Sequence, residues 1–207
     1  MIRHAGKRTL VLENRPRLLS HAAAVGKKEG EGPLGSRFDF VTKNDRLGQK
    51  SWELAESELQ KTAIDLALRK GGLHRRDLDL ILAGDLLNQC IGATFGVREL
   101  GIPYLGIYGA CSNMAEGLLL SAFLAESGLR YLGVSTASHF CTAERQFRYP
   151  NEYGVQKPET TTYTVTGAGA MIFQHEKTPI RLTPALMAPW MCFKNIGSVF
   201  RPPPVPR

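Results

Sequence analysis

Apolar side chains recur at helical spacing in the segment 51–70. Ser51 can cap the amino end of a helix there, and Gly71-Gly72 can end it. Glutamates near its start and basic residues near its end complement the helix dipole. The pattern therefore predicts a helix from residue 51 to about residue 70 that covers a sheet, with an apolar stripe formed by Trp52, Ala55, Leu59, Ala63 and Leu66.

Short apolar runs bounded by glycine and charged residues predict strands, at 8–12, 78–85, 103–108, 130–135 and 165–173. The segment 112–127 lies between two of these runs and is apolar on most sides, so it predicts a buried helix. A strand, a helix and a further strand in this order indicate a parallel sheet and an α/β fold. Residues 13–48 are rich in glycine and charge, and we expect them to form a long surface excursion.

Cys111 lies in the turn between the predicted strand 103–108 and the predicted buried helix, within the run Gly109-Ala110-Cys111-Ser112. Backbone N–H groups at the start of a helix stabilise a thiolate or any nearby anion. The position therefore favours a reactive cysteine or an anion-binding pocket. A cysteine buried as an inert apolar residue is the alternative, although the small neighbours of Cys111 would let a ligand approach.

Polar residues that follow other predicted strands are further candidates for a site. Asp85 and Asn88 come after the strand 78–85, where ligands gather in α/β sheets, but Asp85 could instead cap the next helix. Ser138, His139 and Arg145 belong to a segment that mixes a histidine, arginines and aromatic residues. Such a segment can bind phosphates and stack bases, but we expect it to form a pocket wall or a dimer contact.

Composition limits the size of the core and the kind of partner. The chain has 207 residues, 43% of them hydrophobic, which suffices for one good core or for half of a larger one. Its net charge is +7, and the basic excess falls in the first 50 residues and after residue 150. This distribution suits an anionic membrane, acidic small molecules or simply a solvated surface, and it does not require nucleic acid.

The four cysteines and the amino end bear on the cellular compartment. Cys90, Cys111, Cys141 and Cys192 show neither CxxC spacing nor a zinc-like pattern with histidine, so we interpret them as reduced thiols of a cytosolic compartment. No apolar signal-peptide core is present, and no stretch approaches the roughly 20 apolar residues of a membrane span. We therefore expect any membrane association to be peripheral.

Several runs together resemble one family within the thiolase and ketoacyl-synthase fold. The order of Gly-Ala-Cys-Ser, a serine at a strand end and Thr-Gly-Ala-Gly-Ala entering a strand is similar to the amino-terminal half of that fold. The stage V sporulation protein AD family is the more specific resemblance, carried by the runs 82–89, 142–150, 152–154, 156–158 and 32–35. The resemblance extends from about residue 5 to about residue 182.

This resemblance implies a thiolase-like protein on the cytoplasmic side of the forespore or spore inner membrane. The family is linked to binding dipicolinic acid during its uptake into the spore, together with other stage V sporulation membrane proteins. The motif cysteine carries over to Cys111, which would line the ligand pocket without an established reaction. We expect no cofactor, and dipicolinate, with or without calcium, as the ligand of a pocket formed by Cys111, Ser112, Asp85, Asn88, Ser138, His139 and Arg145.

The resemblance covers one half of a two-half fold. We expect residues 1–182 to form the thiolase-like amino-terminal half, and 183–207 to be a divergent, proline-rich tail, either disordered or the product of a frame shift or premature end. The full-length protein would form a homodimer. The alternative function is an acyltransferase or condensing enzyme with Cys111 as nucleophile, which needs partners from the second half to take protons and stabilise an oxyanion.

Overall fold

The computed structural model describes residues 2–7, 9–12, 16–147 and 163–175, all of which lie within one compact unit, Met1–Glu176. Its helices are α1 (Lys27–Gly30), α2 (Trp52–Lys70), α3 (Ile91–Arg98), α4 (Asn113–Glu126) and α5 (Phe140–Phe147). Its strands are β1 (Ile2–His4), β2 (Leu10–Leu12), β3 (Arg17–Val25), β4 (Phe40–Val41), β5 (Leu80–Gly84), β6 (Tyr104–Gly106), β7 (Tyr131–Ser138) and β8 (Gly167–Gln174). The predicted tail, 183–207, lies outside the described residues.

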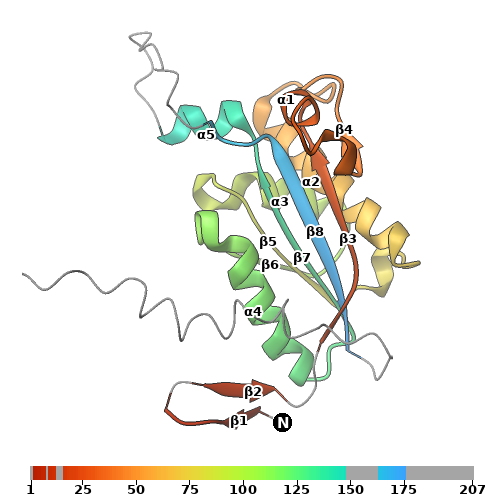
Figure 1. Ribbon diagram of the computed structural model, residues 1–207, viewed down its shortest axis with the longest axis vertical. Helices are drawn as coiled ribbons and strands as arrows, with labels where there is room; N and C mark the ends of the chain where they lie inside the picture. Colours follow the sequence, from red (N-terminus) through yellow and green to blue (C-terminus); the bar gives the residue numbers. More distant parts are fainter. Residues whose placement is uncertain (1, 8, 13–15, 148–162, 176–207) are drawn as a thin grey trace, which may run out of the picture. The chain divides into compact units, whose positions relative to one another are not determined.

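A six-stranded sheet in the order β4-β3-β8-β7-β5-β6 forms the centre of the fold (Figure 1). The pairs β4/β3, β7/β5 and β5/β6 are parallel, whereas β8 runs antiparallel to both β3 and β7. Because β6 and β7 both run parallel to β5, the strand, helix and strand around Cys111 have the predicted parallel arrangement. The expected α/β fold with a mostly parallel sheet is therefore confirmed.

The expectation that residues 13–48 form a surface excursion is wrong for its first part. Strand β3 lies inside the sheet and pairs with β8 from Arg17 opposite Gln174 to Val25 opposite Gly167. Its core positions are alanines, Ala22 and Ala24, which are buried beneath α2. Small side chains give a weak apolar signal, and here they allow a helix to approach the sheet closely. Within the predicted first strand, 8–12, the residues Leu10–Leu12 form β2, which instead pairs with β1 in a separate two-stranded sheet.

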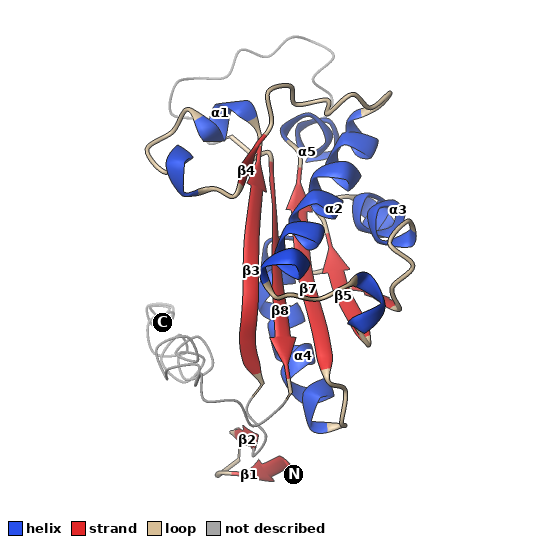
Figure 2. Ribbon diagram, turned by 90° about the vertical axis from the view of Figure 1, so that its right-hand side faces the viewer, coloured by secondary structure: helices blue, strands red, loops and turns tan. Residues whose placement is uncertain are grey.

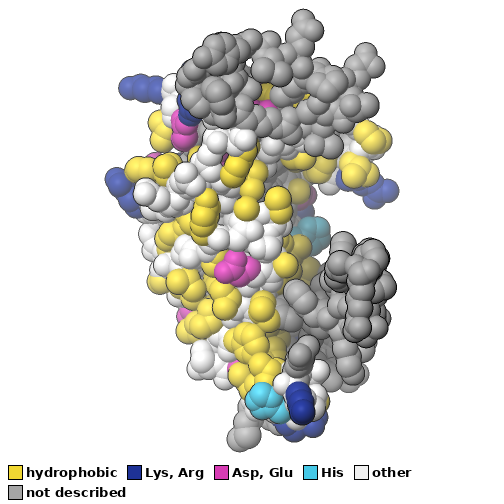
Figure 3. Space-filling model, turned by 90° about the vertical axis from the view of Figure 1, so that its left-hand side faces the viewer, with side chains coloured by type: hydrophobic (Ala, Val, Ile, Leu, Met, Phe, Trp, Pro, Cys, Tyr) yellow, Lys and Arg dark blue, Asp and Glu magenta, His cyan; other side chains and the backbone are white. Residues whose placement is uncertain are grey.

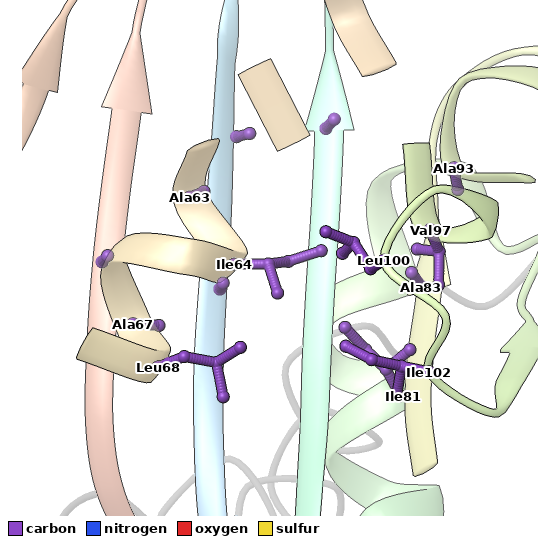
Figure 4. Packing of buried hydrophobic residues seen from close by; sticks show 14 of the residues in the cluster. Ala63, Ile64, Ala67, Leu68, Ile81, Ala83, Ala93, Val97, Leu100 and Ile102 are labelled. Carbon is purple, nitrogen blue, oxygen red and sulfur yellow. The ribbon is translucent and has the colours of Figure 1, made fainter. Parts of the chain in front are cut away.

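Helix α2 covers one face of the sheet, as predicted. The Ser51 hydroxyl accepts a hydrogen bond from the N–H of Leu54, 3.2 Å away, and caps the helix. The helix packs against β3, β7, β8 and α3, and apolar side chains from α2, α3 and β5 meet over the sheet (Figure 4). Each large apolar side chain buried there contributes about 1.5–3 kcal/mol relative to exposure. This face therefore holds the main core.

Helix α4 lies on the opposite face of the sheet, against β5 and β7 (Figures 1 and 2). Its contact is close, because a Cβ on Gly117 would lie only 2.5 Å from a methyl carbon of Val134. The buried residues on α4 are small or polar, namely Asn113, Gly117, Ser121, Ala122 and Ala125. Its large apolar residues are only half-buried, namely Met114, Leu118, Leu119, Leu120, Phe123 and Leu124. The helix is thus buried along its sheet side, and hydrophobic side chains gather on the side of the molecule that carries it (Figure 3).

Candidate functional site

Cys111 lies in a short, strained turn between β6 and α4. Ala110 has a φ of +49°, in the left-handed region that costs a non-glycine residue energy. The backbone N–H and the hydroxyl of Ser112 both donate to the carbonyl oxygen of Gly109, at 2.9 and 2.7 Å. The resulting 3-10 turn, Ala110–Ser112, leaves the Cys111 side chain exposed. The predicted position of this thiol, between a strand and the start of a helix, is confirmed.

Asn113, the first residue of α4, fixes this turn to the end of β5. Its side-chain nitrogen donates to the carbonyl oxygen of Asp85 at 2.9 Å, and its side-chain oxygen accepts from the N–H of Gly109 at 2.5 Å. The two chain segments approach so closely that a Cβ on Gly84 would lie 2.4 Å from the carbonyl oxygen of Ile107. Buried Asn113 therefore sets the position from which Cys111 projects.

Asp85 is buried and caps a helix. One carboxylate oxygen accepts from the N–H of Leu87 at 2.7 Å, and the other accepts from the N–H of Ala93, in the first turn of α3, at 2.6 Å. Burial raises the pKa of the Asp85 carboxyl, while these backbone hydrogen bonds oppose that rise. The geometry matches the capping alternative, because both oxygens are already engaged within the chain.

Asn88 connects the loop after β5 to two other elements. Its side-chain oxygen accepts a hydrogen bond from the Tyr108 hydroxyl at 2.8 Å, and its backbone N–H donates to the side-chain oxygen of Gln146 at 2.9 Å. The Gln146 amide nitrogen in turn donates to the carbonyl oxygen of Leu86 at 3.0 Å. Helix α5 is thereby joined to the loop that holds Asp85 and Asn88, which contacts the segment leading to Cys111.

Ser138 and His139 make contacts within the chain at the start of α5. The Ser138 hydroxyl donates to the carbonyl oxygen of Val165 at 2.6 Å. Nδ1 of His139 accepts from the N–H of Cys141 at 3.1 Å, so Nε2 carries the proton and donates to the carbonyl oxygen of Asp45 at 3.0 Å. His139 is 1% exposed. Nδ1 of His139 therefore holds the start of α5, while Nε2 holds the segment before α2.

Arg145, the remaining candidate, forms an ion pair with Glu53 in the first turn of α2. The seven candidates thus lie in segments at one end of the sheet. The side chains of Asn113, Tyr108 and Gln146 link these segments by hydrogen bonds. The structure leaves the Cys111 side chain exposed, while Asp85, His139 and Arg145 are each engaged by other parts of the chain.

Sequence reasoning missed a buried carboxyl beneath this region, Glu56. It is fully buried, and the Thr142 hydroxyl of α5 donates to its Oε2 at 2.6 Å. Burial, with a smaller contribution from Asp85, raises the pKa of Glu56 to about 8. Within the described residues its other oxygen has no hydrogen-bond partner. The helical spacing of Glu56 and Gln60 with buried Ala63 was the signal that could have located it.

Two surface hollows lie in the described part of the chain, and Cys111 lines neither of them. The larger, about 790 Å³, is at the carboxyl end of α2 and is lined by Asp65, Leu68, Arg69, Leu73, His74, Arg75 and Arg76. The smaller, about 280 Å³, is lined by Lys28, Glu29, Asp45, Phe140, Tyr163, Thr164, Val165 and Thr166. Among the described residues, no three His, Cys, Asp or Glu side chains are placed to hold a metal ion. No described helix is long and apolar enough to cross a membrane.

Comparison with solved structures places the fold among condensing enzymes. Crystal structures of 3-oxoacyl-[acyl-carrier-protein] synthase III from Aquifex aeolicus VF5 and of the priming β-ketosynthase from the R1128 polyketide pathway superpose with TM-scores of 0.53 and 0.51. They are 16% and 18% identical in sequence, over 79% and 84% of this chain and 55% and 54% of theirs. At this identity the likeness shows a thiolase-like fold only.

Comparison of sequences identifies the family. Residues 6–188 match the profile of Stage V sporulation protein AD. The Stage V sporulation protein AD of Bacillus subtilis (strain 168) is 46% identical over 181 residues, which are 87% of this chain and 54% of that protein. The chain thus spans about half the length of this relative. It belongs to the stage V sporulation protein AD family, with the thiolase-like fold that its residues predicted.

Proposed function

We propose that this chain supplies one wall of a binding pocket for a small aromatic dicarboxylate, dipicolinate, and acts without catalysis. The observation that carries the proposal is the exposed Cys111 side chain in the turn that leads into α4. Backbone N–H groups at a helix start favour an anion, and the half-buried leucines beside them offer an apolar surface for a planar ring. Family membership supports a role in sporulation.

The candidate ligand-binding residues form two groups: some are exposed, and others are held by contacts within the chain. Cys111 and Asn88 are exposed at the loops that Tyr108 joins, and Ser112 lies at the first turn of α4. Arg145 could reach a carboxylate only by leaving Glu53, whereas Asp85 and His139 hold the loops in place. We propose that Asp85 and His139 position the wall and that Cys111, Ser112 and Asn88 line it.

Calorimetry on a chimera tests this function. Residues 6–188 of this chain replace the matching segment of the Bacillus subtilis relative, so that both halves are present, and dipicolinate is titrated in. We expect binding that Cys111→Trp abolishes, because the indole fills the space beside the α4 terminus. Ser36→Trp, which adds the same ring to an exposed turn elsewhere, should leave the affinity unchanged. Absence of binding, or equal loss in both variants, contradicts the proposal.

The wider setting follows from the same proposal. The protein associates peripherally with the cytoplasmic side of the forespore or spore inner membrane, beside other stage V sporulation membrane proteins, and forms a homodimer when full length. No nucleic acid is involved. Co-sedimentation of the chimera with vesicles, followed by its release in high salt, would support this placement. A chimera that stays with the vesicles in high salt and is released only by detergent would contradict it.

A second function, acyl transfer, is favoured by the exposure of Cys111 in a strained turn that precedes a helix. In this reaction Cys111 loses its proton to water and its thiolate attacks the carbonyl carbon of an acyl thioester. The tetrahedral intermediate then collapses with cleavage of the original carbon–sulfur bond, and the leaving thiolate takes up a proton from water. Mass spectrometry of the chimera after incubation with acetyl-CoA should then show an acetyl adduct that Cys111→Ser lacks. An unmodified protein removes this alternative and leaves the binding proposal intact.

A further inference from the structure

The larger hollow lies at the carboxyl end of α2, and residues on both sides of the turn that ends this helix line it. Gly72 has a φ of +68°, its N–H donates to the carbonyl oxygen of Arg69 at 3.1 Å, and the N–H of Leu73 donates to that of Leu68 at 3.0 Å. This is a Schellman motif, in which Leu68 and Leu73 supply the accompanying apolar contact. Both leucines line the hollow. The turn therefore fixes where the helix end and the segment after it face one another.

The rim of this hollow is strongly basic. Arg69, His74, Arg75 and Arg76 line it, against a single carboxylate, Asp65. Asp65 is fully used, because Arg75 binds it through two hydrogen bonds, Nε to Oδ1 at 2.8 Å and Nη2 to Oδ2 at 2.6 Å. That pairing holds the Arg75 guanidinium in a fixed orientation.

Arg69 and Arg76 pair with no carboxylate in the part of the chain that the structure describes. Arginines near a helix end often serve only the helix dipole. Here three carbonyl oxygens in the last turn of α2, those of Ala67, Leu68 and Arg69, already accept backbone hydrogen bonds from the turn that follows. Two guanidinium groups thus remain beside a concave surface, and a guanidinium fork matches the geometry of phosphate oxygens.

We propose that this hollow binds a phosphate oxyanion between Arg69 and Arg76, with the anchored Arg75 as a third donor. The oxyanion is either a free phosphate or the phosphate of a lipid headgroup, since both present the same oxygens. The site is separate from Cys111 and does not depend on the dicarboxylate function proposed above.

The test uses the intact chain and two double variants of equal net charge. Arg69→Gln with Arg76→Gln removes the unpaired forks, and Arg37→Gln with Arg98→Gln removes two exposed arginines elsewhere. Inorganic phosphate is titrated at low ionic strength and followed by NMR shifts. We expect the first pair to weaken binding about tenfold or more and the control to change it less than about twofold, since charge-assisted hydrogen bonds are lost only in the first. Melting temperatures equal to that of the unsubstituted chain would verify that both double variants are folded.

Vesicles distinguish the two sources of phosphate. Binding to vesicles that contain phosphatidylglycerol, but not to pure phosphatidylcholine, and its loss in the Arg69/Arg76 variant identify a headgroup. Phosphate binding without this vesicle response identifies a free phosphate. Binding of neither probe, or equal weakening by the control pair, overturns the proposal.

Discussion

Helices α2 and α4 lie on opposite faces of the sheet. The helix with more charged residues, α2, is the more deeply buried, and the more apolar helix, α4, is the less covered. Helix α2 carries many charged residues, yet it buries most of its apolar side chains together with the polar side chains of Glu56, Ser57 and Gln60. Helix α4 is far more apolar, yet its large side chains, including Leu119 and Phe123, stay half-buried. Composition alone would have predicted the reverse.

This difference in burial indicates different roles for the two faces of the sheet. On the α2 face, β3, β7, β8 and α3 of the same chain complete the packing. On the α4 face, the small residues of the helix meet the sheet, and its leucines have no comparable cover among the described residues. A half-covered apolar helix that starts at an exposed cysteine is the type of surface that receives a ligand or a further layer of protein.

Truncating side chains on both faces should give the largest contrast. Ile64 of α2 is fully buried, so Ile64→Ala should lower the free energy of unfolding by about 2–5 kcal/mol through lost burial and a cavity. Leu119→Ala on α4 removes a half-buried side chain and should cost less than about 1.5 kcal/mol. Urea denaturation of both variants measures this difference. Equal losses would show that the α4 face is as complete as the α2 face.

The buried carboxyl of the α2 face should make stability depend on pH. Burial raises the pKa of Glu56 to about 8 in the folded protein, against an ordinary value of 4.5, so the folded state holds a proton that the unfolded state releases. Its stabilising effect is complete below pH 4.5 and is lost as the pH rises through 8. Between pH 6 and pH 8 the loss is about 2 kcal/mol, at about 1.4 kcal/mol for each pH unit.

Denaturation at several pH values measures this loss, with Glu56→Gln as the decisive variant. Glutamine keeps the shape of the side chain and carries no charge, so the fall in stability between pH 6 and pH 8 should shrink markedly. Glu58→Gln on the same helix is the control, since Glu58 is paired with Lys61 near the surface. An unchanged pH dependence in the Glu56 variant would mean that this carboxyl is ionised in the folded protein.

The elements of the fold that followed from the sequence are those with strong local patterns. Helix α2 follows from its apolar stripe and the Ser51 cap, and β5, β7 and β8 follow from apolar runs ended by glycine or polar residues. Strand β3 was missed because its core positions are alanines. The sequence placed α4 correctly, but the prediction that this helix is buried is wrong for its large apolar side chains, which are half-buried, because cover depends on elements far away in the chain.

The site was predictable in position but not in its contacts. Cys111 was placed by the strand and helix that flank it, both local features. His139 and Arg145 were expected to meet a ligand, but they contact Asp45 and Glu53, which precede them by more than 90 residues. Such pairs arise only when α5 packs beside the start of α2. The use of a polar side chain, in structure or in binding, is therefore set by the tertiary fold.

The smallest effect on stability, and the clearest mark of the open face, is expected from polar substitutions on α4. Leu119 and Phe123 are four residues apart and project away from the buried seam of Gly117 and Ser121, since two residues turn a helix by about 200°. Replacing both by glutamine should change the free energy of unfolding by about 1 kcal/mol or less. It should also raise the solubility of the 207-residue chain, which we expect to be poor, and lower its binding of a hydrophobic dye.

Leu59→Gln, on the buried side of α2, is the control and should instead unfold the protein, because an unpaired amide would enter the core. If the α4 variant unfolds as readily as the α2 variant, the leucines of α4 belong to the core, and the two faces do not differ in the way their exposure indicates.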